Sequence, residues 1–444
     1  MGKIETLANE LQQQMPHVEI VADAEILRNY AVDGILPRLI VTPTTVTEAT
    51  RVIELTQQHH LTLLPRGGGS RTNLGGLAEQ IDVMLITTRL THLLEHEAPD
   101  LTCHVEAGIT LAQLQQQLAT KGQRLSLDAP GADQATIGGL LATNASGPKR
   151  LRYGTARDLV IGLKVIQASG EVARSGGRVV KNVAGYDLNK LYIGSLGTLG
   201  VIVEANFKLH PLPASERTLL LTYTTADDVM RTVMAITRSS LTPSAIELID
   251  ARAANDMSDF FGFRLPTNGY TLAVNFEGSP ATIERQINET HLLARKYHVL
   301  LGDDLEGEEQ ERFWEVVREH IQGSLTCKVS IPVSQIAPYL QTIDDVCQRH
   351  DLEAATIAHA GNGILYVELR PSDALQRLVP AIYELRITAQ EERGSLVVER
   401  CPVDLKRRIS IWGEPRGDFP MMQRLKQQFD PEGTFVRGRF LGGL

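Results

Sequence analysis

The spacing of apolar and polar residues predicts alternating helices and strands in the first half of the chain. Apolar positions recur at helical spacing over residues 46–56, directly after the capping box of residues 45–48, and the apolar run 61–64 has the length of a buried strand. From residue 158 to about 213, long strand-like runs are separated by glycine-rich turns. We therefore expect an α+β domain over residues 1–213.

The second half of the chain has a different pattern. Pro211 and Pro213 interrupt the strand pattern and mark a boundary. Beyond them, strands and helices alternate in two successive groups, residues 218–298 and 308–399, which predicts a ferredoxin-like sheet with helices on one face. A last helical segment and a glycine-containing tail should return to the first domain. The predicted domains are therefore residues 1–213, 214–404 and 405–444.

Composition and charge exclude several classes of protein. The chain of 444 residues is 43% hydrophobic and 22% charged, which argues against a disordered or coiled-coil protein. Its net charge of -9, from 44 Lys+Arg and 53 Asp+Glu, gives no general attraction to nucleic acid or anionic lipid. No apolar run approaches the roughly 20 residues of a membrane span. We expect a cytoplasmic protein, with attachment to the inner membrane through partners as the alternative.

The four cysteines also limit the chemistry. Cys103, Cys327, Cys347 and Cys401 lie far apart in the sequence, so no C-x-x-C pair is available to hold an iron–sulfur cluster or a zinc ion. Buried thiols in a reducing compartment are the favoured interpretation.

Three glycine-rich clusters are the main candidate binding elements. They cover residues 65–70, 130–147 and 194–200. Glycine after a buried strand allows consecutive backbone N–H groups to approach an anion closely. The first cluster lacks the Lys-Ser/Thr of a P-loop and the G-x-G-x-x-G of a dinucleotide-binding helix. One such loop alone is usually a turn, but three in one domain favour a nucleotide diphosphate.

These clusters carry a resemblance to a known family. Residues 65–70, 130–139, 152–158 and 181–201 resemble the flavoproteins with the vanillyl-alcohol-oxidase, or p-cresol-methylhydroxylase (PCMH), type of FAD domain. The last stretch is most similar to the FAD-binding subunits of glycolate oxidase and to D-lactate dehydrogenases. The resemblance implies a PCMH-type FAD-binding domain of two α+β subdomains, with a ferredoxin-like α+β cap domain. It is dense over residues 36–213 and thin elsewhere.

The resemblance also implies which residues bind FAD. Those around the pyrophosphate would be Arg66, Gly67, Gly68, Gly69 and Ser70, faced by Pro130, Gly131, Thr136, Gly138 and Gly139. Those along the ribityl chain and the flavin ring would be Asn144, Ser146, Gly147, Tyr153 and Gly154, and those near the adenine half would be Val201 and Ile202. Some relatives tether the flavin through a His in the first loop. Ser70 follows Gly69 here, so non-covalent FAD is expected.

Two departures from the family pattern concern the reaction. Relatives that use a metal to oxidise D-2-hydroxy acids carry His-x-Gly-Asp-Gly-Asn-x-His. Here the stretch begins at His359, Asn362 replaces the acid, and the second imidazole is absent at Leu365 or Tyr366. These donors make a poor divalent-metal site, so no metal is expected.

The other departure is Leu196, where catalytic relatives commonly carry Glu within Gly-Ser-Glu-Gly-Thr-Leu-Gly. Both departures make the chain look more like the second, smaller FAD subunit of the glycolate oxidase complex than like its principal catalytic subunit.

Several single residues have two interpretations. His359 is either a general base for a substrate hydroxyl or a hydrogen-bonded core residue. Arg66 and Lys181 either bind a phosphate or a substrate carboxylate, or they neutralise a nearby acid. Glu247, alone in a strand-like run, faces a partner, a substrate or solvent.

The resemblance implies oxidation of glycolate or D-lactate to the 2-oxo acid, with hydride transfer to FAD. Onward electron transfer would need a separate iron–sulfur subunit or a quinone, beside a catalytic homologue of this chain. The alternative is a flavin-binding assembly or electron-relay subunit without turnover of its own. A third interpretation is a sugar or phenol oxidase of the same fold.

Overall fold

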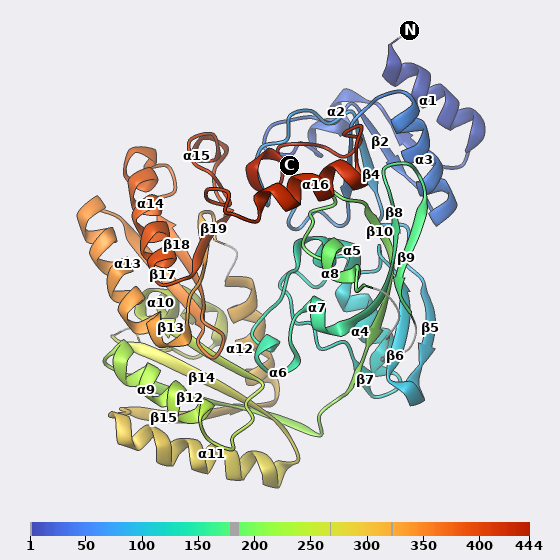
Figure 1. Cartoon of the computed structure of the whole chain (residues 1–444). Coiled ribbons are helices and arrows are strands. Elements are labelled where there is room, and N and C mark those ends of the chain that lie inside the picture. Colours follow the sequence, from blue (N-terminus) through green and yellow to red (C-terminus); the bar gives the residue numbers. More distant parts are fainter. Residues whose placement is uncertain (1, 178–185, 267, 321–322) are drawn as a thin grey trace. The chain divides into compact units, whose positions relative to one another are not determined.

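The computed structural model describes residues 2–177, 186–266, 268–320 and 323–444 (Figure 1). They form two compact units. Unit 1 comprises Met1–Ser146, Thr155–Leu212 and Glu414–Leu444, and unit 2 comprises Gly147–Gly154 and Pro213–Gly413. These ranges differ from the expected domains at residues 147–154, 213 and 405–413, which belong to unit 2.

The first sheet of unit 1 has the strand order β1-β2-β4-β3. Its strands are β1 (Glu19–Val21), β2 (Leu39–Thr42), β3 (Leu63–Arg66) and β4 (Val83–Ile86). The helices of this part are α1 (Lys3–Gln14), α2 (Ala24–Arg28) and α3 (Val46–Gln58). The predicted capping box starts α3: Thr45 accepts a hydrogen bond from the Glu48 amide at 3.2 Å. Because β3 pairs in parallel with β4, its carboxyl end at Arg66 leads directly into the first glycine cluster.

The second sheet of unit 1 is antiparallel, in the order β5-β6-β10-β8-β9. Its strands are β5 (Leu93–Glu97), β6 (Thr102–Glu106), β8 (Val160–Ile166), β9 (Val172–Gly176) and β10 (Val201–Lys208). Two short strands, β7 (Gln123–Arg124) and β11 (His210–Pro211), pair separately. The helices are α4 (Leu111–Ala119), α5 (Ile137–Thr143), α7 (Ala156–Leu159), α8 (Asn189–Tyr192) and, near the carboxyl terminus, α16 (Phe419–Phe429). Buried residues of α4, α5 and the sheet share one core.

Unit 2 is built on one antiparallel sheet in the order β15-β12-β14-β13-β17-β18-β16-β19. Its strands are β12 (Ser215–Tyr223), β13 (Ala245–Asp250), β14 (Tyr270–Gly278), β15 (Leu301–Glu306), β16 (Thr326–Ser330), β17 (Glu353–His359), β18 (Ile364–Arg370) and β19 (Ser395–Arg400). Its helices are α6 (Arg150–Tyr153), α9 (Ala226–Thr237), α10 (Ala251–Phe261), α11 (Pro280–Ala294), α12 (Gly307–His320), α13 (Ile336–His350), α14 (Leu375–Glu391) and α15 (Val403–Lys406).

The two halves of this sheet repeat one topology. Strands β12 to β15 and strands β16 to β19 each have the order fourth, first, third, second, which is the ferredoxin-like arrangement, and β13 pairs with β17 to join the halves. The predicted ferredoxin-like sheet is therefore confirmed.

The prediction that helices cover only one face of this sheet was wrong. Helices α9, α11, α13 and α14 share a core with residues such as Leu248 and Leu365 on one face. Helices α10 and α12 cover part of the other face, over Ile249 and Ile357. The difference arises because α10 is inserted between β13 and β14, and α12 follows β15. The rest of that second face carries the polar side chains described below.

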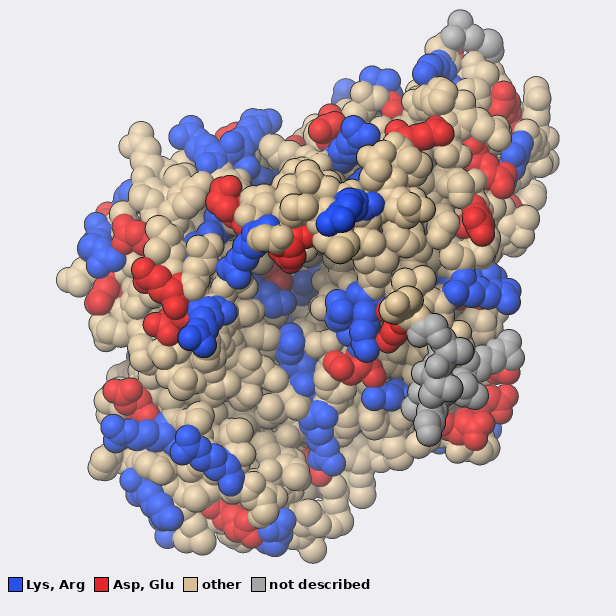
Figure 2. Space-filling model, viewed as in Figure 1, with Lys and Arg blue, Asp and Glu red and all other residues tan. Residues whose placement is uncertain are grey.

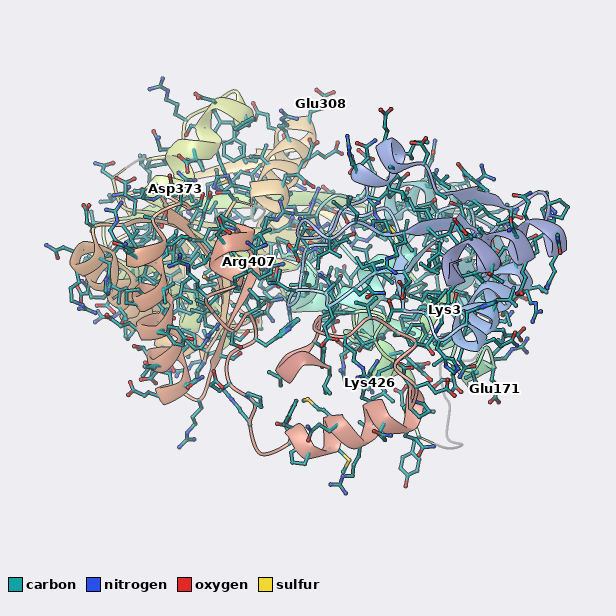
Figure 3. The ribbon with its side chains drawn as sticks, turned by 90° about the horizontal axis from the view of Figure 1, so that it is seen from above. Lys3, Glu171, Glu308, Asp373, Arg407 and Lys426 are labelled. Carbon is teal, nitrogen blue, oxygen red and sulfur yellow. The ribbon has the colours of Figure 1, made fainter. Side chains whose placement is uncertain are left out.

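On the face shown in Figure 2, Lys and Arg side chains are interspersed with Asp and Glu over most of the surface. Lys426 on α16, labelled in Figure 3, is a buried lysine of unit 1. Its ammonium lies 2.5 Å from Asp430 and donates to the Thr198 carbonyl at 2.9 Å, which fixes the helix to the loop before β10. None of the described helices is long and apolar enough to cross a membrane.

Candidate functional site

A groove in unit 1 lies where β3 ends. It encloses about 560 Å³ of space open to solvent. The residues that line it come from the end of β3, the loop after it, α5 and two distant segments: Leu64, Pro65, Arg66, Gly67, Gly68, Gly69, Ser70, Arg71, Thr72, Thr136, Gly139, Leu140, Ala142, Thr143, Leu196 and Arg439. Seven of the residues expected to bind FAD therefore line a single groove.

The groove requires glycine in its first loop. A Cβ on Gly67 would lie 2.0 Å from the Thr136 hydroxyl oxygen, and one on Gly68 would lie 1.7 Å from the Gln134 carbonyl oxygen. Neither position has space for a side chain, so the backbone of residues 67–68 packs directly against the loop before α5. The backbone at Gly131 also lies beside the first glycine loop, because a Cβ built on Gly131 would lie 3.8 Å from the Cβ atom of Ser70.

Arg66 is the strongest indication of an anionic ligand. Its guanidinium lies 4.7 Å from the centre of the Tyr30 ring and folds back over Gly69. Its Nε and Nη1 atoms are buried and have no hydrogen-bond partner among the described residues. Burial lowers the pKa of Arg66, but a guanidinium stays charged in proteins. Unpaired buried donors on a cation are costly, so this position favours a ligand that brings negative oxygen atoms.

Helix α5 forms the opposite wall. The Thr136 hydroxyl caps the helix by accepting from the Gly139 amide at 3.3 Å. Gly138 has a different role, since its N–H donates to the Ala107 carbonyl at 2.7 Å and a Cβ would lie 2.9 Å from the Ala107 side chain. Gly138 therefore allows α5 to approach the end of β6, and it is not among the residues that line the groove.

The carboxyl-terminal tail contributes Arg439 to the groove. This buried guanidinium donates to the carbonyls of Thr72 and Leu74, the latter at 2.5 Å, and lies 3.6 Å from the Asp33 carboxylate. These contacts hold the backbone that follows the first glycine loop. From the sequence, the tail was expected to return to the first domain, but Arg439 was not assigned to the site.

Leu196 lines the groove as well. Its backbone has φ 55, a conformation uncommon outside glycine, and its N–H donates to the Ala142 carbonyl at 2.8 Å. The apolar side chain that distinguishes this chain from catalytic relatives therefore lies where the cofactor is expected.

The other residues expected to bind FAD occupy several environments. Pro130 and Ser146 are buried in unit 1, and Asn144 ends α5 with φ 48. The Asn144 side-chain oxygen is buried without a hydrogen-bond partner in the part of the chain that the structure describes. Val201 and Ile202 are buried core residues of β10.

The remaining predicted positions lie elsewhere. Gly147, Tyr153 and Gly154 belong to unit 2 rather than to the unit that contains the groove. Within unit 2 the Tyr153 hydroxyl donates to the Glu277 carboxylate. Lys181 is outside the described residues.

Taken together, the groove residues fit FAD. The unpaired nitrogen atoms of Arg66 and the glycine backbone of residues 67–69 would hold a diphosphate.

Unit 2 contains a second polar centre on the sheet face opposite α13 and α14. Both carboxylate oxygens of Glu247, on β13, lie 2.8 Å from Nδ1 of His359, on β17. Both side chains are almost completely buried, with 0% and 1% exposure. Nε2 of His359 is also buried and has no hydrogen-bond partner within residues 2–177, 186–266, 268–320 and 323–444.

The electrostatic environment keeps this imidazole neutral. Burial lowers the pKa of His359 to about 3, and the positive charges of Arg150 and Lys328 act in the same direction. A neutral ring with Nδ1–H donated to a carboxylate presents a lone pair at Nε2. Burial makes this nitrogen a weak base, so proton transfer to it depends on the Glu247 carboxylate, which stabilises the imidazolium that forms.

A half-buried charge cluster lies in the same unit. Lys149 forms ion pairs with Glu277 at 2.6 Å and with Glu216 at 3.0 Å. Together with the bond from Tyr153, these contacts fix the short segment of residues 147–154 to β12 and β14. Arg150 belongs to this segment, so the cluster determines where its charge lies.

The comparisons with known proteins support an FAD-linked oxidase. Residues 37–176 match the model of the FAD binding domain, and residues 212–440 match the C-terminal domain of FAD linked oxidases. A D-lactate dehydrogenase of Anaerostipes hadrus is 30% identical, covering 91% of this chain and 89% of that protein. A glycolate oxidase subunit, GlcD, of Bacillus subtilis is 28% identical over the same shares.

Similar solved structures extend over nearly the whole chain. p-Cresol methylhydroxylase with substrate bound has a TM-score of 0.78 at 16% identity and covers 99% of this chain and 97% of its own. A 4-ethylphenol oxidase from Gulosibacter chungangensis has a TM-score of 0.75 at 14% identity, with coverage of 97% and 96%. These likenesses confirm the expected PCMH-type α+β fold.

Proposed function

This chain belongs to the FAD-linked oxidases, and on that premise we propose that it oxidises a 2-hydroxy acid, such as glycolate or D-lactate, to the 2-oxo acid. The observation that supports this substrate class is the Glu247–His359 pair, whose unpartnered Nε2 has two cationic side chains, Arg150 and Lys328, close enough to affect it. A hydroxyl next to a carboxylate needs both a proton acceptor and a cation.

In the proposed reaction, each polar residue of unit 2 has a separate role. Nε2 of His359 accepts the substrate hydroxyl proton, and Glu247 holds the ring in the required tautomer. Arg150 and Lys328 attract the carboxylate. Bound FAD would supply the hydride acceptor, and loss of the C–H hydride and of the O–H proton to His359 would leave a carbonyl on the carbon that carried the hydroxyl.

The residues of unit 1 hold the cofactor. Arg66 and the backbone of residues 67–70 bind its diphosphate, while Arg439 maintains the loop that follows. Ser70 occupies the place at which some relatives carry a tethering His, so we propose that FAD is bound non-covalently.

A second candidate function is favoured by Leu196. An apolar side chain lines the groove where catalytic relatives commonly carry Glu. The chain would then be a flavin-binding assembly or electron-relay subunit beside a catalytic homologue. In both cases a separate iron–sulfur subunit or a quinone would carry the electrons onward, since the four cysteines lie far apart in the sequence.

Anaerobic reduction of the FAD-loaded chain distinguishes these functions. We expect glycolate or D-lactate to bleach the flavin absorbance, and 4-ethylphenol to leave it unchanged. Bleaching by the hydroxy acids only after partner subunits are added would favour the second function. Bleaching by the phenol alone would refute the proposed substrate class.

A further inference from the structure

Five side chains form a continuous row across unit 2, one from each of five neighbouring strands. The strands lie in the order β13, β17, β18, β16 and β19. The corresponding side chains are Glu247, His359, Tyr366, Lys328 and Glu399. We call this set the polar row.

Each member of the polar row contacts the next. After the Glu247–His359 bond, the His359 and Tyr366 rings meet edge to face with centroids 5.3 Å apart. Lys328 Nζ lies 5.6 Å from the centre of the Tyr366 ring and 3.2 Å from a Glu399 carboxylate oxygen. The strand register explains this order, since Lys328 and Tyr366 are directly paired across β16 and β18.

Burial decreases along the polar row. Glu247, His359 and Tyr366 are buried, whereas the side chains of Lys328 and Glu399 keep 22% and 15% exposure. The row therefore runs from a buried proton acceptor to an ammonium that a small anion can reach.

The polar row does not fit the metal that some relatives use. Leu365 packs in the core on the other face of the sheet. Tyr366 therefore occupies the place beside His359 where those relatives carry the second imidazole. Asn362 donates its N–H to the His359 carbonyl at 2.9 Å in the turn between β17 and β18. Lys328 has no lone pair to offer a metal and repels one. Over the residues that the structure describes, no group of three His, Cys, Asp or Glu side chains could hold a metal ion.

We propose that Lys328 supplies the positive charge that a divalent metal supplies in those relatives, and that it binds the carboxylate of the 2-hydroxy acid next to His359. This inference rests on the proposed function and specifies its substrate site. An ammonium has three donors and can bind a carboxylate while paired with Glu399. Glu399 pairs with the Lys328 ammonium, and the Tyr366 ring contacts both this ammonium and the His359 imidazole.

The test uses FAD-loaded full-length protein that has been treated with EDTA and dialysed, with oxalate as the probe. Oxalate has adjacent oxygen atoms like those of a bound 2-hydroxy acid, but it has no C–H bond to lose as hydride. We expect wild-type protein to bind oxalate equally well before and after chelation. Lys328→Met should weaken binding about 10- to 100-fold, and Lys328→Arg should retain most of it. Lys296→Met removes an exposed lysine of the same unit and should change nothing.

Further controls test whether the loss of binding comes from an unpaired Glu399 or from misfolding. Because Lys328→Met removes the partner of Glu399, the double variant Lys328→Met/Glu399→Gln is measured beside it, and the same weakening is expected. Thermal unfolding and FAD content identify any variant that fails to fold.

Three results would overturn the role of Lys328: wild-type affinity that disappears on chelation and returns with Zn²⁺ or Mn²⁺, full affinity in Lys328→Met, or no oxalate binding by wild-type protein. Anaerobic reduction by D-lactate keeps this test distinct from that of the proposed function. Loss of reduction only after chelation refutes the role of Lys328, whereas a flavin that no 2-hydroxy acid reduces refutes the proposed function.

Discussion

Nδ1 of His359 lies 2.8 Å from both carboxylate oxygens of Glu247. The pair determines which ring nitrogen carries the proton, because a carboxylate only accepts. In Glu247→Gln the amide can donate instead, which moves the proton to Nε2 and removes the acceptor. We expect flavin reduction to slow by roughly 10²- to 10⁴-fold with the fold intact.

Nitrogen NMR of labelled histidine checks this cause directly. The wild-type ring should be protonated at Nδ1 and the variant ring at Nε2. Glu353→Gln, which removes an exposed carboxylate of the same strand as His359, is the matched control. An unchanged tautomer in Glu247→Gln would contradict the assigned role.

The lowered pKa of His359 predicts how stability depends on pH. The pKa falls from an ordinary value near 6.5 to about 3 in the folded protein, so between these values the unfolded chain binds a proton that the folded chain does not. This contribution to stability is present above about pH 6.5 and is lost as the pH falls, by up to about 1.4 kcal/mol per pH unit. Urea unfolding of wild-type protein and of His359→Gln at each pH measures this contribution as the difference between their free energies of unfolding.

The destabilisation caused by His359→Gln should therefore shrink between pH 6.5 and pH 4.5. Asp250, whose pKa burial raises to about 6, has the opposite dependence but is present in both proteins and cancels. Parallel stability curves for the two proteins would show that His359 titrates normally.

Gly68→Ala should remove FAD binding. The new Cβ would lie 1.7 Å from the Gln134 carbonyl oxygen, so the first glycine loop must move away from the wall formed by the loop before α5. Gly417→Ala is the control, since a Cβ there meets no described atom within 4 Å. Equilibrium dialysis with FAD is the measurement, and equal affinity in both variants would exclude this groove as the diphosphate site.

Arg66→Leu should weaken FAD binding without lowering the stability of the FAD-free protein. The buried Nε and Nη1 atoms have no partner among the residues described, so their loss should leave the melting temperature of the FAD-free protein unchanged or higher. FAD affinity should fall about 10- to 100-fold as the charge-assisted bonds to the diphosphate are lost. A lower melting temperature together with full FAD affinity would show that Arg66 is a structural residue.

Local patterns were sufficient to predict much of the fold and the groove. The capping box at Thr45, the run before Arg66 and the two strand–helix groups each depend on residues close together in the sequence. The first glycine cluster and Thr136 could be assigned because each belongs to a short motif that carries the family resemblance, and the structure brings both to one groove.

The polar row could not be predicted in the same way. Its members come from strands that become neighbours only in the sheet order β13-β17-β18-β16-β19. The spacing of apolar residues along the chain predicts strands and helices, but it does not predict the order of strands in a sheet. Lys328 did carry a local signal, as a single charge within the apolar run 325–331, but its partner Glu399 is distant in the sequence. Arg439 was missed for the same reason, because its contacts with Thr72 and Leu74 cross most of the chain.

Anaerobic stopped-flow reduction of bound FAD by D-lactate, compared between wild-type protein and His359→Gln, tests whether His359 accepts the substrate proton. We expect rapid bleaching in the wild type and a rate lower by roughly 10²- to 10⁴-fold in the variant at equal FAD content. Equal rates in the two proteins would contradict the claim that His359 accepts the substrate proton.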